Sequence, residues 1–208
     1  MNIKKAFYRC ASPLKYVGVI YEKALTLRKI LYTAMMAPFF KSFGVNSIIK
    51  PRMNRLDGGK CIEIGDLCYI GKNVSLLANT SYIGVSYTPE IVISDRCSIG
   101  DECNITCINK IYLGKGVLLG RKVLVTDHGH GDSSMIGGDV PVRARPLVSP
   151  GPVIIEDEVW IGEKASIMPN VRIGKGSIIG ANSVVTKDVP PYSVAVGSPA
   201  RVVKMVKA

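Results

Sequence analysis

Apolar residues recur at every sixth position through the C-terminal third of the chain. The residues that follow this spacing are Ile155, Ile161, Ile167, Ile173, Ile179 and Val185. Each is followed four positions later by a small or β-branched residue, namely Val159, Ala165, Val171, Ser177, Ser183 and Val189. This period matches neither an α-helix, at roughly 3.6 residues per turn, nor the alternation of a simple strand. A short internal repeat of this kind predicts stacked coils that bury a continuous core between neighbours.

The same spacing continues upstream in three shorter blocks. They begin at Ile64 and Ile70, at Ile93 and Ile99, and at Leu113 and Leu119, with Cys68, Val74, Cys97, Cys103, Val117 and Val123 four residues on. The spacing slips over residues 78–91 and 126–152, which indicates loops that leave the coil. Gly162, Gly174 and Gly180 follow repeated apolar residues, where a tight corner benefits from the absence of a Cβ. We therefore predict a β-helical domain over residues 51–189 with a loop over 126–152, followed by a tail over 190–208.

The composition agrees with an all-β body. The 208 residues are 47% hydrophobic and include 21 glycines and 12 prolines, which suits one turn-rich domain with an appendage. Of the six cysteines, Cys68, Cys97 and Cys103 occupy the small-residue position of the repeat, which favours reduced, buried thiols. The chain has no CxxC motif and lacks the pattern of a secretory signal peptide, so we expect a cytoplasmic location.

The first fifty residues differ from the rest. They carry nine Lys or Arg and one acidic residue, Glu22, and so hold a net +8 of the chain's +11. Ser12 and Pro13 predict the start of a helix, and Pro38 predicts its end. Apolar residues follow at helical spacing between them: Val17, Ile20, Tyr21, Ala24, Leu27, Leu31 and Met35. We expect residues 1–50 to form a basic, largely helical segment.

Two interpretations of this basic segment stay open. The helix either packs on the end of the solenoid and shields its open strands, or rests on an anionic membrane surface at the inner face of the membrane. The apolar stretch over residues 31–40 is too short to span a bilayer. Nucleic-acid binding would need a basic face with recognisable reading elements, and the sequence shows neither.

The candidate chemistry lies in the sequence VTDHGHGD at residues 125–132. It holds the only two histidines of the chain, His128 and His130, at the break that begins the longest loop. Histidine is the natural general base near neutral pH. A zinc site would need at least three converging donors, and with only two histidines available we expect no metal.

Three motifs together make the chain resemble the hexapeptide-repeat acyltransferase superfamily. They are VWIG at 159–162, IGKGSIIGANSVVTKDVPP at 173–191 and GSPARV at 197–202. The resemblance covers roughly residues 50–205 and is closest to the maltose/galactoside O-acetyltransferase branch. NKIYLG at 109–114, leading to DHGHG at 127–131, is similar to surface-polysaccharide O-acetyltransferases in particular.

The resemblance implies a fold, a cofactor and an assembly. The fold is a left-handed parallel β-helix of triangular section that forms a homotrimer. Acetyl-CoA, the co-substrate, lies in the groove between two subunits, and a carbohydrate acceptor enters from the opposite side. The family's catalytic histidine falls on His128, because it follows Val125 and Thr126 as in the family. His130 is then a loop or acceptor-side residue.

The resemblance also implies binding residues. Trp160 and, less directly, Asn104 fall on acceptor contacts, and Asn109 competes with Asn104 for its assignment. Contacts to CoA carry over onto Gly162, Ala181 and Thr186, with Lys187 and Arg201 near the nucleotide phosphates. Small residues let an extended pantetheine arm lie close, and Lys and Arg supply charge and donors to phosphate oxygens. The repeat alone would also select residues such as Gly162, Ala181 and Thr186, without any contact to CoA. Glu163 stands where the family has a hydroxyl residue, so the resemblance does not carry that contact over.

The activity so implied is direct acetyl transfer from acetyl-CoA to a sugar hydroxyl of a surface polysaccharide or its precursor, with His128 as general base. The main alternative is N-acetylation of a nucleotide-linked amino sugar. Serine acetyltransferases have a large helical N-terminal domain, and γ-type carbonic anhydrases need three histidine ligands, so both are disfavoured. A non-catalytic β-helix that serves as a structural or binding module is the alternative of another class.

Overall fold

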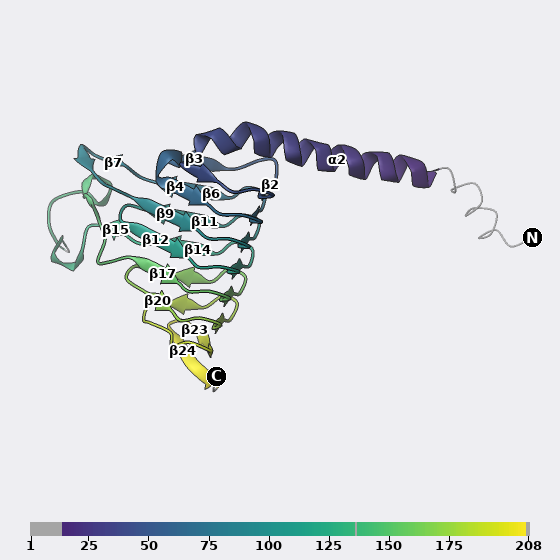
Figure 1. The fold of residues 1–208 in the computed structure, drawn as a ribbon. Coiled ribbons are helices and arrows are strands. Elements are labelled where there is room, and N and C mark those ends of the chain that lie inside the picture. The colour runs from purple at the N-terminus through teal and green to yellow at the C-terminus, as the bar shows by residue number, and fades with distance from the viewer. Residues whose placement is uncertain (1–13, 136, 207–208) are drawn as a thin grey trace, which may run out of the picture.

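The computed structural model describes residues 14–135 and 137–206, so the helix start predicted at Ser12 and Pro13 lies outside the described residues. The chain winds in stacked coils through three sheets that enclose the core, so that the solenoid is a three-sided prism (the stack of coils is seen from the side in Figure 1). Sheet A contains β1 (Ser42–Phe43), β4 (Ile62–Ile64), β9 (Glu90–Ile93), β12 (Lys110–Leu113), β17 (Val153–Ile155) and β20 (Arg172–Ile173). Sheet B contains β2 (Ile48–Ile49), β5 (Tyr69–Ile70), β10 (Ser98–Ile99), β13 (Leu118–Leu119), β18 (Trp160–Ile161), β21 (Ile178–Ile179), β23 (Ser193–Gly197) and β24 (Ala200–Met205). Sheet C contains β3 (Arg55–Asp57), β6 (Ser75–Ala78), β11 (Asn104–Cys107), β14 (Leu124–Thr126), β19 (Ser166–Ile167) and β22 (Val184–Val185).

Each coil of the chain contributes one strand to each sheet, and equivalent strands pair in parallel. In the C-terminal coils Ile155 lies beside Ile173, and Ile161 lies beside Ile179, at the separation that the repeat sets. The repeated apolar residues and their small partners are buried in one continuous core. The exception to the parallel order within these sheets is β24, which returns antiparallel to β23 at the C-terminal edge. The five cysteines in the described part of the chain are unpaired.

Glycine at the corners serves close stacking of the coils rather than an unusual backbone angle. A Cβ on Gly162 would lie 2.5 Å from the backbone nitrogen of Ala181, and one on Gly174 would lie 2.4 Å from that of Pro191. The left-handed residue of the corner comes two positions later, at Lys164 with φ 58°. The glycine therefore removes a clash with the next coil.

Two long excursions leave the solenoid where sheet C passes to sheet A. The first, residues 79–89, contains the hairpin of β7 (Ser81–Tyr82) and β8 (Val85–Ser86). The second, residues 127–152, contains β15 (Gly129–His130) paired antiparallel with β16 (Leu147–Val148). It also carries the short 3₁₀ turns η3 (Ser133–Met135) and η4 (Val142–Ala144). Both excursions project from the same corner of the prism (Figure 1).

The N-terminal helix α2 (Leu14–Met36) crosses the top of the solenoid and then extends beyond it (Figure 1). Its last turns are attached: the Thr33 hydroxyl accepts a hydrogen bond from the backbone N–H of Ile49 at 2.9 Å, and the Tyr32 hydroxyl accepts one from Met53 at 3.0 Å. The following turn, η1 (Ala37–Phe39), precedes Phe40, which fills the end of the core. The end of α2 therefore caps the first coil.

The apolar residues that predict the helix lie on the face of α2 opposite to its packed face. Tyr32, Thr33 and Met36 contact the solenoid, whereas Val17, Ile20, Leu27, Leu31 and Met35 are all exposed. These five residues stand at i, i+3, i+10, i+14 and i+18, positions that share one helix face at about 3.6 residues per turn, so the exposed set forms one stripe. Within the described residues, no helix combines the length and the hydropathy needed to cross a bilayer.

Candidate active site

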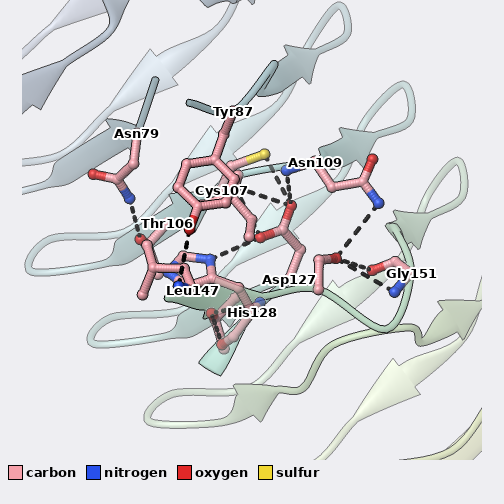
Figure 2. Close-up of polar contacts among 12 residues, drawn as sticks. Asn79, Tyr87, Thr106, Cys107, Asn109, Asp127, His128, Leu147 and Gly151 are labelled. Carbon is pink, nitrogen blue, oxygen red and sulfur yellow. Dashed lines mark hydrogen bonds and ion pairs between the residues drawn. The ribbon is translucent and has the colours of Figure 1, made fainter. Parts of the chain in front are cut away.

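Asp127 and His128 lie at the point where β14 leaves sheet C. Val123 and Val125 point inward, and the alternation of the strand carries Asp127 inward as well, where it is completely buried. Its carboxylate oxygen Oδ1 lies 2.8 Å from Nδ1 of His128 (Figure 2). The imidazole side chain is only 9% exposed, so the pair sits at the rim of the core.

The Asp127 carboxylate accepts hydrogen bonds from neighbours on the preceding coil. The backbone N–H of Ile108 donates to Oδ1 at 3.0 Å, and the backbone N–H of Asn109 donates to Oδ2 at 2.8 Å. The thiol of Cys107 donates to Oδ2 at 3.1 Å. Burial by itself would raise the pKa of Asp127, but the hydrogen bonds from His128, Cys107 and these backbone groups outweigh it and lower the pKa. Asp127 is therefore ionised at neutral pH.

An ionised Asp127 fixes the tautomer of His128. The Asp127 oxygens accept hydrogen bonds, so the proton of the neutral imidazole belongs on Nδ1, as assigned from this network. Nε2 then carries the free lone pair. A backbone turn holds the ring in place, because the Thr126 hydroxyl donates to the His128 carbonyl at 3.0 Å and accepts from its N–H at 3.3 Å. The arrangement suits a general base.

A cleft of about 480 Å³ lies beside the pair, between the two excursions. Its lining is Ser86, Tyr87, Thr88, Ile108, Asn109, Leu147, Val148 and Ser149. His128 is not in this lining, but Ile108 and Asn109 are, so the cleft and the Asp127 carboxylate share a wall. The Tyr87 hydroxyl accepts a hydrogen bond from the backbone N–H of Leu147, and the Asn109 amide donates to the Ser149 hydroxyl at 3.4 Å (Figure 2).

The cleft offers hydroxyl and amide groups over an apolar floor, and none of the described residues that line it is charged. Such a lining fits a neutral polar ligand with several hydroxyl groups, because each ligand hydroxyl can donate and accept hydrogen bonds while ring carbons pack on Ile108 and Leu147.

His130 lies apart from the Asp127–His128 pair. It is exposed on β15, pairs with Leu147 of β16, and meets the edge of the Tyr82 ring at a centroid distance of 5.3 Å. Tyr82 in turn donates to the carbonyl of Arg143 at 2.8 Å. His130 therefore belongs to the contact between the two excursions.

The predicted acceptor residues Asn104 and Trp160 lie on other faces of the prism. Asn104 is exposed at the start of β11 on sheet C, beside Leu124. Trp160 is 50% exposed at the start of β18 on sheet B, with Leu118 and Ile178 as neighbours. The single chain places His128 at the corner between sheets C and A, so it does not bring Trp160 to His128. Asn109, the competing assignment, lines the cleft beside the carboxylate.

The predicted CoA residues fall into separate groups in one chain. Gly162 and Ala181 stack on each other at the corner between sheets B and C. Thr186 and Lys187 are exposed just after β22, at the corner between sheets C and A. Arg201 is exposed on β24 and donates to the carbonyl of Ala200. Glu163, the departure from the family, follows Gly162, and its carbonyl accepts from the backbone of Asn182 at 2.9 Å.

Asp127 is not among the site residues predicted from the sequence, although the structure binds it to His128. The sequence did contain a signal for it. Val123, Val125 and Asp127 alternate, so Asp127 occupies an inward position, and a buried carboxylate there is unfavourable unless neighbouring groups compensate its charge. Among the residues described, no cluster of three or more His, Cys, Asp or Glu side chains has the arrangement of a metal site.

Comparison with known proteins assigns the family. The family model described as "bacterial transferase hexapeptide (six repeats)" matches residues 152–187. A putative acetyltransferase of Schizosaccharomyces pombe is 37% identical over 161 residues, which cover 72% of this chain and 75% of that protein. The putative lipopolysaccharide biosynthesis O-acetyl transferase WbbJ of Escherichia coli is 36% identical over 118 residues, 55% of this chain and 60% of WbbJ.

Two solved structures share the fold. The N-acyltransferase AntD of Bacillus cereus, in complex with dTDP and 3-hydroxybutyryl-CoA, has a TM-score of 0.70 at 22% identity over 85% of this chain and 88% of its own. The hexapeptide-repeat acetyltransferase VCA0836 of Vibrio cholerae, complexed with acetyl coenzyme A, has a TM-score of 0.52 at 27% identity over 84% of this chain and 76% of its own.

The chain belongs to the hexapeptide-repeat transferase family. This confirms the predicted left-handed parallel β-helix and, at the level of the family, the prediction of an acyltransferase.

Proposed function

We propose that the protein transfers an acetyl group from acetyl-CoA to a hydroxyl of a surface polysaccharide or its precursor. The observation that carries this proposal is the buried, ionised Asp127 bound to Nδ1 of His128, which leaves Nε2 as the base. The names of the relatives, acetyltransferases that include the lipopolysaccharide O-acetyl transferase WbbJ, support the reaction class.

In the proposed mechanism, Nε2 of His128 takes the proton from the acceptor hydroxyl as its oxygen attacks the carbonyl carbon of the acetyl thioester. The new C–O bond forms a tetrahedral intermediate, and its collapse breaks the C–S bond. The imidazolium then gives its proton to the departing CoA thiolate, so His128 returns to its starting state. Asp127 stabilises the imidazolium and holds the ring orientation as a carboxylate, without taking up the proton itself. It is a positioning residue.

The acceptor is proposed to enter the cleft between the two excursions. The hydroxyl groups of Tyr87, Thr88 and Ser149 and the amide of Asn109 can bind sugar hydroxyls there. No Lys or Arg is among the described residues of this lining, which favours a neutral glycan over a sugar nucleotide, because the diphosphate of a sugar nucleotide would call for cations. This favours O-acetylation of a glycan over N-acetylation of a nucleotide-linked amino sugar, which remains the second candidate because AntD shares the fold.

Acetyl-CoA is proposed to bind between subunits of a homotrimer. On sheet B the exposed side chains of Leu118 and Trp160 are neighbours, and exposed Tyr69 follows beyond Ser98; a neighbouring subunit would cover this row. A neighbour packed in this way could bring its own Trp160 toward His128 of this chain. Gly162, Ala181 and Thr186 would then lie along the pantetheine, with Lys187 and Arg201 near the phosphates. VCA0836 is a relative of this fold with acetyl coenzyme A bound.

Thiol release from acetyl-CoA tests the proposal, with a panel of neutral oligosaccharides, nucleotide-linked amino sugars and no acceptor. Release that depends on a neutral glycan, with an alkali-labile ester in the product, supports O-acetylation. Release that depends on an amino sugar, with an alkali-stable amide, replaces it with the second candidate. No release and no binding of CoA by calorimetry would identify a non-catalytic β-helix.

A further inference from the structure

The outer face of α2, formed by Val17, Ile20, Leu27, Leu31 and Met35, is apolar and points away from the solenoid. All five side chains are exposed, and Ile20 reaches 67%. The opposite face holds Leu25, Tyr32 and Met36, which are at least partly buried. An exposed apolar stripe of this length on a helix that leaves the body of the protein marks a surface that contacts an apolar phase or a partner.

A basic cleft of about 480 Å³ lies under α2 where the helix leaves the solenoid. Its lining is Leu25, Arg28, Lys29, Lys50, Pro51, Arg52 and Lys72. The first three come from α2, the next three from the turn after β2, and Lys72 from the corner of the next coil. The helix and the solenoid therefore bring five cationic side chains together in one cleft.

These cations are poorly neutralised by the protein. Lys50 donates to Asp101 at 3.3 Å and lies over the Tyr69 ring at 5.1 Å. The other four, Arg28, Lys29, Arg52 and Lys72, form no ion pair with any described carboxylate. Further along the same corner, Arg121 and Lys122 both approach Glu102, at 3.8 Å and 3.6 Å. The cleft thus keeps an excess of positive charge that an anionic ligand would neutralise.

We propose that α2 and the basic cleft form a peripheral binding site for anionic phospholipid: the outer face of α2 enters the acyl region, and the cleft binds a lipid phosphate. An apolar helix face flanked by Lys and Arg is the arrangement of an interfacial helix. Charge complementarity at the cleft favours this occupant over a second copy packed through the same surface, because the five cations of one cleft would then face the same five cations of the other. The inference does not depend on acyl transfer.

Vesicle co-sedimentation tests the site on the full chain. The protein is expected to bind vesicles of phosphatidylcholine with phosphatidylglycerol, and binding is expected to weaken as salt rises and to vanish with phosphatidylcholine alone. The double variant Arg28→Gln/Lys72→Gln should bind about 25-fold more weakly, because each cation near the surface contributes ~1 kcal/mol, or about fivefold. Lys164→Gln/Lys175→Gln removes the same charge from exposed positions away from the cleft and should lower binding much less.

A second variant separates the apolar surface from the charge. Ile20→Gln/Leu27→Gln keeps the net charge and the helix propensity and should abolish vesicle binding, while the mass measured by light scattering stays that of the wild type. Loss of the oligomer in this variant would show that the helix face packs on another subunit and would overturn the proposal. Equal binding to neutral vesicles, or binding of inorganic phosphate without binding of vesicles, would overturn it as well.

Discussion

The phenol oxygen of Tyr87 accepts a hydrogen bond from the backbone N–H of Leu147 at 2.9 Å, and this bond joins the two excursions that form the cleft. Tyr87 belongs to residues 79–89, and Leu147 lies on β16 of residues 127–152. Leu147 also pairs with His130, and Tyr82 of the first excursion contacts the His130 ring. The cleft, and the acceptor site proposed in it, therefore depends on contacts between the two excursions.

Tyr87→Phe should weaken binding of the glycan substrate more than binding of acetyl-CoA. The change removes the acceptor of the Leu147 N–H, and a lost hydrogen bond at a partly buried group costs about 1 kcal/mol, or roughly fivefold. We expect KM for the glycan to rise by about this factor, with KM for acetyl-CoA unchanged. Steady-state kinetics with each substrate varied in turn checks the result. Tyr112→Phe, on sheet A, is the control, and an equal effect in both variants would contradict this role of Tyr87.

His128→Ala should lower kcat by about 10²–10⁴-fold, as expected for loss of a general base. His130→Ala is the matched control, because it removes the other histidine of the same loop, whose ring contacts Tyr82 rather than Asp127. Turnover is measured by thiol release, and thermal unfolding shows whether each variant is folded. Near-normal turnover of His128→Ala beside a large loss in His130→Ala would reverse the two roles.

Asp127→Asn should reduce the stability of the protein at neutral pH but not in acid. The pKa of Asp127 is lowered in the folded state, so its ionised form stabilises the fold above the unfolded pKa of about 3.9. This contribution is lost as pH falls through the still lower folded pKa. The free energy of unfolding, measured with urea, should therefore differ most between wild type and Asp127→Asn near pH 7, and the difference should shrink toward pH 2. A constant difference across this range would show that the charge of Asp127 is not responsible.

The Cys107 thiol contacts the candidate site through its hydrogen bond to Asp127. Burial and the neighbouring Asp127 charge raise the pKa of Cys107, so the neutral thiol donates to the carboxylate. Cys107→Ala removes one donor and should lower kcat by roughly fivefold, whereas Cys107→Ser keeps a donor and should retain more activity. Cys103→Ala is the control, since its buried thiol donates to the Gly120 carbonyl instead. Equal losses of kcat in Cys107→Ala and Cys103→Ala would show that the effect comes from altered packing and not from the hydrogen bond to Asp127.

The core of the solenoid could be predicted from the sequence because every repeated apolar residue packs against the equivalent residue of the next coil. Ile161 and Ile179 are thus found together as the period requires. The sequence did not predict which face of α2 packs, because Tyr32 and Thr33 dock through hydrogen bonds to backbone groups of a coil that the helix pattern does not encode. It placed Trp160 with His128 only through the resemblance, since the two lie on different faces of one chain.

Glycine substitutions provide a test of how the coils stack. A Cβ on Gly162 would lie 2.5 Å from the nitrogen of Ala181, an approach that backbone atoms cannot relieve without moving the coil. Gly162→Ala should therefore lower the free energy of unfolding by about 1–3 kcal/mol, the usual cost of overpacking. Gly18→Ala is the matched change in α2, where no atom lies within 4 Å of the added Cβ, and helix propensity should make it neutral or stabilising by up to ~1 kcal/mol.

Chemical unfolding of both variants gives the comparison, and the KM for acetyl-CoA adds a second reading. Since Gly162 and Ala181 are also proposed to lie along the pantetheine, a shift of this corner should raise KM for acetyl-CoA in Gly162→Ala and leave it unchanged in Gly18→Ala. A destabilised Gly162→Ala with unaltered KM would keep the packing argument and remove this corner from the cofactor groove. A fully stable Gly162→Ala would show that the coils can separate at this corner, so glycine there would not be required for stacking.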